Sequence, residues 1–344
     1  TTSYGDILKA INEAMEGKHF EEFKDIDYLP EKLGKRVLTT GGHFGYLKIA
    51  EGCDKHCTYC IIPKLRGKFR SVPMERLIEQ AKEMAEEGVK ELILVAQETT
   101  VYGTDIYGKK SLHVLLKELC KIKGIRWIRV LYCYPEEIYD ELIQTMKEEK
   151  KICHYLDLPI QHASDRILKR MGRRTTQAEL VAIVNKLRQE IPDIVLRTTL
   201  ISGFPGETQE DHEELMGFVD EMEFDRLGVF TYSAEEDTPA ATMPDQVPEE
   251  VKEERRDEIM ELQQEISYDK GTDRIGQELL VMIEGKVADE SAYIGRTYGD
   301  APKVDGYIFV QTGELLMTGD FAKVRVTGAL EYDLIGELAD EYTE

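Results

Sequence analysis

The sequence lacks two features that direct a protein to or across a membrane. It has no uninterrupted apolar run of the length that spans a bilayer, which is about 18 residues or more. Its opening residues, 1–4, have neither the basic region nor the apolar segment of a secretory signal peptide. Low-complexity tracts are absent too, and the only repetition is an alternation of strand and helix patterns. We therefore expect a cytoplasmic protein without a membrane partner.

Basic residues are scarce relative to acidic ones. The 344 residues include 44 Lys and Arg against 67 Asp and Glu, which gives a formal net charge of −23. A surface field of this sign repels polyanions, so a basic partner fits better than nucleic acid as a direct substrate. The alternative interpretation is that the acidity only keeps the protein in solution.

Cysteine is also scarce, and the six residues present are not expected to form disulfides, because the cytosol keeps thiols reduced. Cys120, Cys133 and Cys153 lie in apolar stretches, where a free cysteine behaves as a small buried hydrophobe. The other three cysteines are clustered, and they are considered below for their chemistry.

From about residue 45, short β-branched runs alternate with amphipathic helical segments, which is typical of βα units around a parallel sheet. The predicted strands are Tyr46–Ala50, Glu91–Ala96, Trp127–Leu131, Tyr155–Leu158, Ile194–Ile201 and Leu227–Thr231. Predicted helices near 74–87, 111–122, 136–149, 176–190 and 208–223 supply the crossovers that parallel strands need. Six units predict an α/β fold, an open partial (βα)6 barrel, with reactive groups on the loops after the carboxyl ends of the strands.

Changes of pattern divide the chain into three parts. Residues 41–271 contain the βα units and end in a long charged helix, from Pro248 to about Lys270. Residues 1–40, which include an amphipathic helix around Ile7 to Met15, are too short for a domain and are expected to be a linker.

The third part, residues 272–344, predicts a small all-β antiparallel barrel. Gly-rich turns separate alternating strands such as Leu279–Ile283, Tyr307–Val310 and Ala322–Val326. The segment carries 15 acidic against 6 basic side chains, whereas a barrel that binds nucleic acid is normally basic.

Three cysteines, Cys53, Cys57 and Cys60, share one loop after the first predicted strand with the spacing C-x3-C-x2-C. A structural zinc site needs four protein ligands, commonly two C-x2-C pairs, and only His56 is a further candidate nearby. An electron-transfer 4Fe-4S cluster usually has four cysteines, whereas three leave one iron open to bind another molecule. An open iron indicates chemistry, and a non-catalytic Fe-S or zinc binding module is the alternative.

At this spacing the loop resembles that of the radical S-adenosylmethionine (radical SAM) superfamily. The resemblance implies a 4Fe-4S cluster whose three metal ligands are Cys53, Cys57 and Cys60 and whose open iron chelates the amino and carboxylate groups of SAM. It further implies an electron donor that reduces the cluster. Tyr59, the aromatic residue before the third cysteine, is implied to lie against the adenine.

Further positions match the superfamily at the ends of later predicted strands. Gln97 and Glu98 stand where its members usually have a Gly-Gly-Glu motif that receives the methionine amino group, although an ordinary polar loop is the alternative. Gln161 and Ser164 follow the fourth predicted strand, where Ser164 could instead cap the next helix and His162 could be a helix-terminus partner.

The fifth predicted strand ends in a turn whose glycines allow a ligand to approach the backbone closely. Arg197 and Thr198 are candidates for contacting the SAM carboxylate or ribose, and Gly203 is a candidate for backbone contact. Tyr232, after the sixth strand, completes the residues that the resemblance assigns to SAM.

Four blocks narrow the resemblance to the methylthiotransferases: residues 46–66, 158–164, 171–174 and 230–233, with a terminal barrel similar to their TRAM domain. One branch of this family modifies an adenosine of transfer RNA, and the other modifies an aspartate β-carbon of small-subunit ribosomal protein twelve. Gln161-His162, the segment 295–302 and the acidic barrel favour the second branch. An acidic barrel attracts a basic ribosomal protein and repels a phosphate backbone.

Members of this family also have an amino-terminal domain with three more cysteines, which hold a second 4Fe-4S cluster implicated in sulfur supply. The remaining cysteines of this sequence lack a suitable spacing for one. We therefore expect that this domain is absent and that residues 1–40 are the linker after it. The implied reaction generates a 5′-deoxyadenosyl radical that removes hydrogen from the aspartate β-carbon, where sulfur then bonds before a second SAM methylates it. Without the domain, we expect the chain to cleave SAM but not to complete sulfur insertion.

Overall fold

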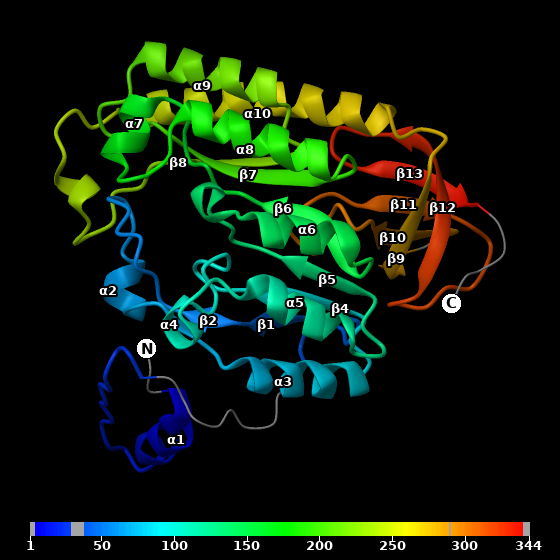
Figure 1. The fold of residues 1–344 in the computed structure, drawn as a ribbon, viewed down its shortest axis with the longest axis horizontal. Coiled ribbons are helices and arrows are strands. Elements are labelled where there is room, and N and C mark those ends of the chain that lie inside the picture. The colour runs from blue at the N-terminus through cyan, green and yellow to red at the C-terminus, as the bar shows by residue number, and fades with distance from the viewer. Residues whose placement is uncertain (1–3, 29–37, 289, 340–344) are drawn as a thin grey trace.

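A sheet of six parallel strands organises the molecule. The computed structural model describes residues 4–28, 38–288 and 290–339, and Figure 1 shows their arrangement. The sheet is open and its strand order is β1-β4-β5-β6-β7-β8, so each strand pairs with the next one of the sheet along the chain. The bounds are β1 Phe44–Lys48, β4 Glu91–Val95, β5 Trp127–Val130, β6 Ile152–Asp157, β7 Val195–Ser202 and β8 Arg226–Thr231. The predicted open α/β sheet is confirmed.

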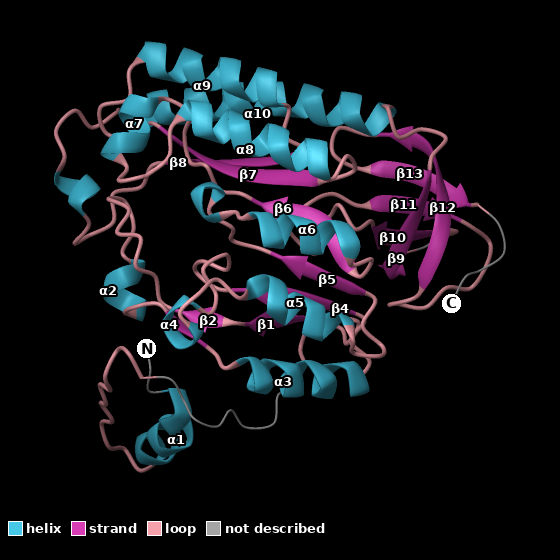
Figure 2. Ribbon diagram, in the orientation of Figure 1, coloured by secondary structure: helices cyan, strands magenta, loops and turns pink. Residues whose placement is uncertain are grey.

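Helices cover one face of the sheet, because the connection between two parallel strands must cross back over it. Figure 2 shows these helices on the outer side of the strands. They are α3 Met74–Glu86, α5 Leu112–Cys120, α6 Asp140–Glu148, α8 Gln177–Glu190 and α9 Gln209–Met222, in agreement with the sequence periodicity. Both α8 and α9 begin with a capping box, formed by Thr176 with Glu179 and by Thr208 with Asp211.

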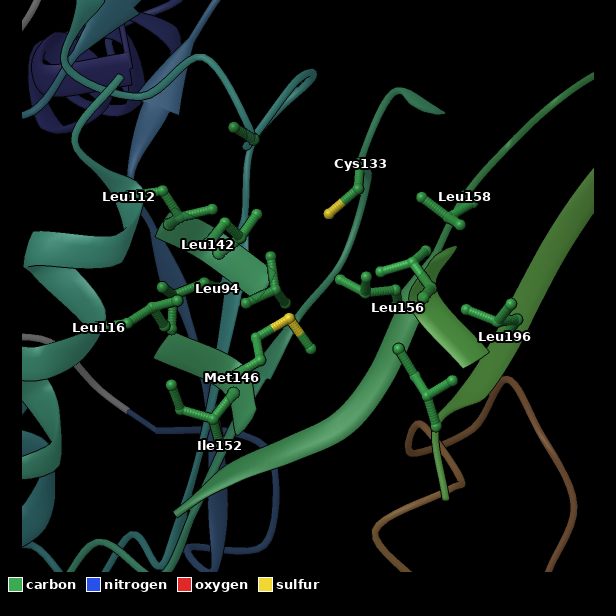
Figure 3. Packing of buried hydrophobic residues seen from close by; sticks show 14 of the residues in the cluster. Leu94, Leu112, Leu116, Cys133, Leu142, Met146, Ile152, Leu156, Leu158 and Leu196 are labelled. Carbon is green, nitrogen blue, oxygen red and sulfur yellow. The ribbon is translucent and has the colours of Figure 1, made fainter. Parts of the chain in front are cut away.

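Alternation along each strand decides which side chains meet the helices. In β4, Leu92 and Leu94 pack in the main core, whereas Ile93 packs on the opposite face. Figure 3 shows Leu94 of the sheet, Leu116 of α5 and Met146 of α6 converging in this core. Because both faces of the central strands are buried, their sequences are almost continuously apolar.

The three cysteines outside the motif belong to apolar cores. Cys133 lies in the main core (Figure 3), and Cys120 packs against it from the end of α5. Cys153 is buried in the second core, on the other face of the sheet. Their prediction as small core residues is confirmed.

Short elements gather at the carboxyl ends of the strands. They are β2 Ala50–Glu51, α2 Ile62–Arg66, β3 Arg70–Ser71, α4 Thr104–Tyr107, the 3-10 turns Pro135–Glu137 and Pro239–Thr242, and α7 Asp165–Arg170. In Figure 1, α2, α4 and α7 lie at one end of the sheet, and the C-terminal strands lie at the other.

The C-terminal part is a closed barrel of five strands in the order β10-β11-β13-β12-β9. The bounds are β9 Glu278–Lys286, β10 Ala292–Arg296, β11 Ile308–Gln311, β12 Phe321–Ala329 and β13 Leu334–Leu338. Four pairs are antiparallel, but β11 and β13 are parallel. The predicted small all-β barrel is confirmed, but this one pair is parallel rather than antiparallel, because the β12–β13 hairpin places β13 rather than β12 beside β11.

The long charged helix, α10 Glu249–Thr272, joins the two parts and packs along α9 and β8. It ends next to the predicted domain boundary between residues 271 and 272. No helix in the described part of the chain, α10 included, combines the length and apolarity that a membrane span needs.

Buried ion pairs fasten the barrel to the sheet. Glu91 accepts hydrogen bonds from Arg129 Nε of β5 at 2.8 Å and from Arg296 Nη2 of β10 at 2.7 Å, and all three side chains are fully buried. Arg296 also donates to Glu284 Oε1 at 2.7 Å. Burial raises the pKa of Glu91, but the two arginines hold it below its usual value. We call Glu91, Arg129, Glu284 and Arg296 the seam network.

Further ion pairs extend this contact along the face of the sheet opposite the helices, which we call the inner face. Arg226 of β8 bonds to Asp300 at 2.5 Å. Arg197 of β7 donates to Asp157 at 2.7 Å and lies 3.3 Å from Asp305 of the C-terminal part. The barrel therefore covers the amino-terminal half of the inner face, and the loops at the carboxyl ends remain outside this contact.

The amino-terminal segment lies beside the loops at the carboxyl ends. The predicted amphipathic helix is present as α1 Ile7–Met15, preceded by a 3-10 turn at Tyr4–Asp6. Asp27 accepts hydrogen bonds from the Lys68 backbone and from Arg70, both at 3.0 Å. Part of the predicted linker, residues 29–37, lies outside the described residues.

We expect replacement of Arg296 by Met to destabilise the chain by roughly 3 kcal/mol or more, because Glu91 and Glu284 then lose a buried cation. Urea denaturation measures this free energy. The control is Arg256→Met, whose partner Asp257 is exposed, with an expected change within about 0.5 kcal/mol. Equal effects of the two substitutions would contradict the role of the seam network.

Candidate functional site

The cysteine loop follows β2, the short strand after β1. Hydrogen bonds to two other segments hold its first half. Cys53 N donates to Gly67 O at 3.2 Å, and Gly52 N donates to Gln97 Oε1 at 2.8 Å. Gly52 has φ of 77°, and a Cβ there would collide with the Lys68 carbonyl. Only glycine allows the chain to enter the loop this way.

The second half of the loop rests on the connection after α7. Thr58 N donates to Met171 O at 2.9 Å, and the Thr58 hydroxyl donates to Arg170 O at 2.8 Å. On its other side, Thr58 O accepts from Ala240 N at 2.9 Å. The backbone conformation of the cysteine loop is thus held by segments that follow three different strands.

The three thiols form a soft, largely desolvated donor set. Cys53 and Cys57 are buried, Cys60 is half-buried, and none forms a disulfide. Burial raises the pKa of Cys53 to about 11 and also raises that of Cys60. Metal binding must therefore displace the protons, as it does at thiolate sites generally.

Single-ion geometry is not found at this loop. Among the residues that the structure describes, no three Cys, His, Asp or Glu side chains are grouped so as to hold one metal ion. Three cysteines in one loop are the number of protein ligands of an Fe-S cluster that keeps one iron open.

Glu98, after β4, places a buried carboxylate near the loop. Its side chain is 1% exposed, Oε1 accepts from Thr100 N at 2.9 Å, and Oε2 has no partner among the described residues. Burial raises the pKa of Glu98 to about 7. An unpaired buried oxygen of this kind suits a cationic ligand group. The neighbouring Gln97 uses its own side-chain oxygen to hold Gly52.

The backbone of the turn after β7 is held by hydrogen bonds to the Glu207 side chain. Glu207 Oε2 accepts from Gly203 N at 2.9 Å and from Phe204 N at 3.1 Å, while Oε1 accepts from Arg255 at 2.8 Å. Burial raises the pKa of Glu207, but His162 and Arg255 hold it below its usual value. Gly203 has φ of 70°, and a Cβ there would meet Lys252.

Three aromatic rings pack against one another between this turn and the cysteine loop. The Tyr59 and Phe204 rings are 6.4 Å apart and the Phe204 and Tyr232 rings 5.3 Å apart, both edge to face. The Tyr232 hydroxyl is buried without a partner among the described residues. The structure therefore brings together Tyr59, Tyr232 and the turn that contains Gly203, three of the residues predicted to contact SAM.

Two predicted SAM contacts, Thr198 and Ser164, use their side-chain hydroxyls in hydrogen bonds within the protein. Thr198 is on the helix-covered face of β7, and its hydroxyl donates to Leu158 O at 2.8 Å. Thr199 is on the opposite, inner face. The Ser164 hydroxyl is buried and donates to Asp211 at 2.7 Å, so it ties α7 to α9.

The other two predicted contacts are Arg197, on the face of β7 opposite the helices, and Gln161, in the segment after β6. Arg197 is engaged by Asp157 and Asp305, so its first role is in the contact with the barrel. Gln161 has φ of 72° and continues the pairing with β7, since its N donates to Thr199 O at 2.9 Å. Its half-buried side chain remains a candidate.

The sequence reasoning missed a cationic and aromatic group beside Cys57. Cys57 Sγ lies 3.7 Å from the Tyr134 hydroxyl. The Arg173 guanidinium lies 4.3 Å and Lys55 Nζ 5.0 Å from the centre of the Tyr134 ring. Burial lowers the pKa of Arg173, but Tyr59, Glu136 and other groups raise it above its usual value. The signals available in the sequence were the position of Tyr134 after β5 and the Met-Gly-Arg-Arg block.

Comparisons with known proteins agree with this geometry. Residues 47–219 match the radical SAM superfamily and residues 275–339 match the TRAM domain. The chain is 64% identical over 336 residues to "Ribosomal protein uS12 methylthiotransferase RimO" of Lachnoclostridium phytofermentans, covering 98% of this chain and 76% of that protein. The chain belongs to the radical SAM methylthiotransferase family. A relative of the same name from Clostridioides difficile is 49% identical, covering 99% of this methylthiotransferase and 77% of the relative.

The fold of this methylthiotransferase also resembles a solved structure of low sequence identity. Coproporphyrinogen III oxidase (HemN) from Escherichia coli, described as a radical SAM enzyme, superimposes with a TM-score of 0.51 at 16% identity. The match covers 83% of this chain and 68% of HemN, and it supports the fold alone.

We expect replacement of Glu98 by Gln to stabilise the chain at pH 8. A carboxyl whose pKa is raised on folding loses stabilisation as pH rises through about 7, whereas Gln stays neutral. The gain should be on the order of 3 kcal/mol at pH 8 and should nearly vanish at pH 4. Urea denaturation at both pH values tests this, with the exposed Glu87→Gln as control. A gain that is the same at pH 4 and pH 8 would refute the assignment.

Proposed function

We propose that this chain is a radical SAM methylthiotransferase that adds a methylthio group to the β-carbon of an aspartate in ribosomal protein uS12. The observation that carries the proposal is the 64% identity, over 98% of the chain, to a protein named for this activity. The three-cysteine loop, as the site of the radical chemistry, and the C-terminal barrel, as the site of substrate binding, support the proposal.

Cys53, Cys57 and Cys60 would hold a 4Fe-4S cluster, with SAM at the open iron. When bound, the cluster would supply the electron for the reductive cleavage of SAM into methionine and a 5′-deoxyadenosyl radical. The protein's tasks are to orient SAM, exclude water and present the target carbon. An electron donor of low potential is the second partner implied.

The buried polar atoms around the loop suggest how SAM is oriented. Glu98 Oε2, unpaired and desolvated, would accept the methionine ammonium, and Gln97 would act by holding Gly52. Tyr59 and Tyr232 would flank the adenosine, with the backbone of Gly203 close by. On the face of β7 opposite the helices, Thr199 is a further candidate contact beside Thr198.

Sulfur supply requires a source beyond these residues. Cys120, Cys133 and Cys153 lie in apolar cores and are not placed to hold another cluster. A second 4Fe-4S cluster would therefore need ligands other than these three cysteines. The relatives are longer, since the matched regions make up 76% and 77% of their lengths.

Charge supports a basic protein as substrate. The C-terminal part carries 15 acidic against 6 basic residues, and Glu314, Glu331 and Glu337 are exposed on the barrel. Such a surface attracts a basic ribosomal protein and repels RNA. Since ribosomal proteins are made and assembled in the cytoplasm, we also propose a cytoplasmic location.

The substrate is tested by incubating the anaerobically reconstituted enzyme, supplied with SAM, reductant and sulfide, with uS12 and, separately, with transfer RNA. We expect reductant-dependent 5′-deoxyadenosine from this chain, and a mass gain of one methylthio group on uS12 only when a protein segment that holds the second cluster is supplied as well. The matched control is Cys57→Ala, which should abolish both products. A mass gain on transfer RNA alone would overturn the substrate, and absence of 5′-deoxyadenosine from the parent enzyme would overturn the radical reaction.

We expect the triple substitution of Glu314, Glu331 and Glu337 by Gln to raise KM for uS12 several-fold at low salt, because it removes part of the attraction. The value of kcat should stay unchanged, since these residues lie on the barrel, away from the cysteine loop. Steady-state kinetics at low and high salt measure the difference, which should shrink as salt screens the charges. An unchanged KM at low salt would contradict docking on the barrel.

A further inference from the structure

Tyr134 lies directly against one of the cluster ligands. Its hydroxyl is 3.7 Å from Cys57 Sγ, and Tyr134 is positioned by the 3-10 turn Pro135–Glu137 that follows it. A cysteine thiolate that binds iron can only accept a hydrogen bond. In the loaded enzyme the Tyr134 hydroxyl must therefore be the donor to this sulfur.

Arg173 adds a buried positive charge next to this hydrogen bond. Its side chain is 1% exposed, and the guanidinium stacks on the Tyr134 ring at 4.3 Å. One nitrogen, Nη2, donates to Pro159 O at 3.1 Å and meets Glu136 at 3.5 Å. The other two, Nε and Nη1, are buried and have no partner among the described residues.

The charge of Arg173 is less compensated than that of its neighbour. Lys55, over the same ring at 5.0 Å, forms an ion pair with Glu137, which also binds Lys110 at 2.8 Å. Arg173 has only the longer contact with Glu136, whose side chain is 16% exposed. Leaving two N–H donors of a buried cation without acceptors costs free energy. We therefore expect a bound group to supply an acceptor or a negative charge near Arg173.

We propose that Tyr134 and Arg173 are positioning residues that raise the reduction potential of the cluster bound by Cys57. The inference rests on the proposed function only in so far as it requires the cluster. On one-electron reduction the cluster gains one negative charge, and a low-potential donor supplies the electron. A hydrogen bond to the ligand sulfur and a nearby buried cation both stabilise this more negative form.

The test is a potentiometric titration, followed by electron paramagnetic resonance, of the full reconstituted chain without SAM and without substrate. The variants are Tyr134→Phe, Arg173→Lys and Arg173→Met, and iron content is measured for each. We expect more negative potentials for Tyr134→Phe and Arg173→Met at unchanged iron content. In Arg173→Met the equilibrium constant for reduction should fall about tenfold, which corresponds to 59 mV for one electron. Arg173→Lys, which keeps the charge but loses the fork of donors, should recover most of the shift.

Matched controls separate this effect from general damage. Tyr139 also has a lysine over its ring, Lys110 at 5.4 Å, but its hydroxyl bonds to His113. Arg188 binds the Met222 and Glu223 carbonyls through Nη2. Tyr139→Phe and Arg188→Lys should leave the potential of the parent enzyme unchanged.

Unchanged potentials in Tyr134→Phe and Arg173→Met would overturn the proposal. If Arg173→Met does not retain iron, Tyr134→Phe decides alone, and a parental potential for it counts against us. A result in which RNA replaces uS12 as substrate would leave these potentials untouched, because no substrate is present. Failure of the parent chain to take up iron would overturn both the function and this inference.

Discussion

The buried carboxylate of Glu91 is the contact on which the arrangement of the two parts depends. It is shared by one arginine of the sheet and one of the barrel, and all three side chains are excluded from water. Ions in such a place are tolerated only when each is paired, so the barrel and the sheet fit together in one position. In that position the barrel covers the amino-terminal half of the inner face. The candidate site therefore lies at the other end of the sheet, at the carboxyl ends of the strands.

At that other end, the site is built from polar atoms whose hydrogen-bonding capacity is only partly used. Glu98, Tyr232 and Arg173 each have a buried atom without a partner among the described residues. Native interiors rarely leave such atoms unsatisfied, and groups of them mark places where a ligand completes the structure. The cysteine loop lies among them, and it is held by backbone hydrogen bonds that do not use its sulfurs.

Much of this could be predicted from the sequence because it is set by local pattern. Strands such as β4 are continuous apolar runs, helices follow their amphipathic period, and the cysteine spacing is itself the signal. What could not be predicted depends on which face a side chain takes. Thr198 and Thr199 differ by one residue and point to opposite faces, so an error of one position exchanges them. The parallel pairing of β11 with β13, and the stacking of Arg173 on Tyr134, join segments far apart in sequence, for which periodicity carries no information.

The closure of the C-terminal barrel restricts how a partner can be recognised there. Each of the five described strands pairs with a neighbour on both sides, so none of them is an edge strand along its whole length. Little backbone is therefore left for a partner that binds by adding a strand, which is one way of capturing an extended peptide. Recognition on this surface therefore depends on side chains and loops, and it suits a partner that is already folded.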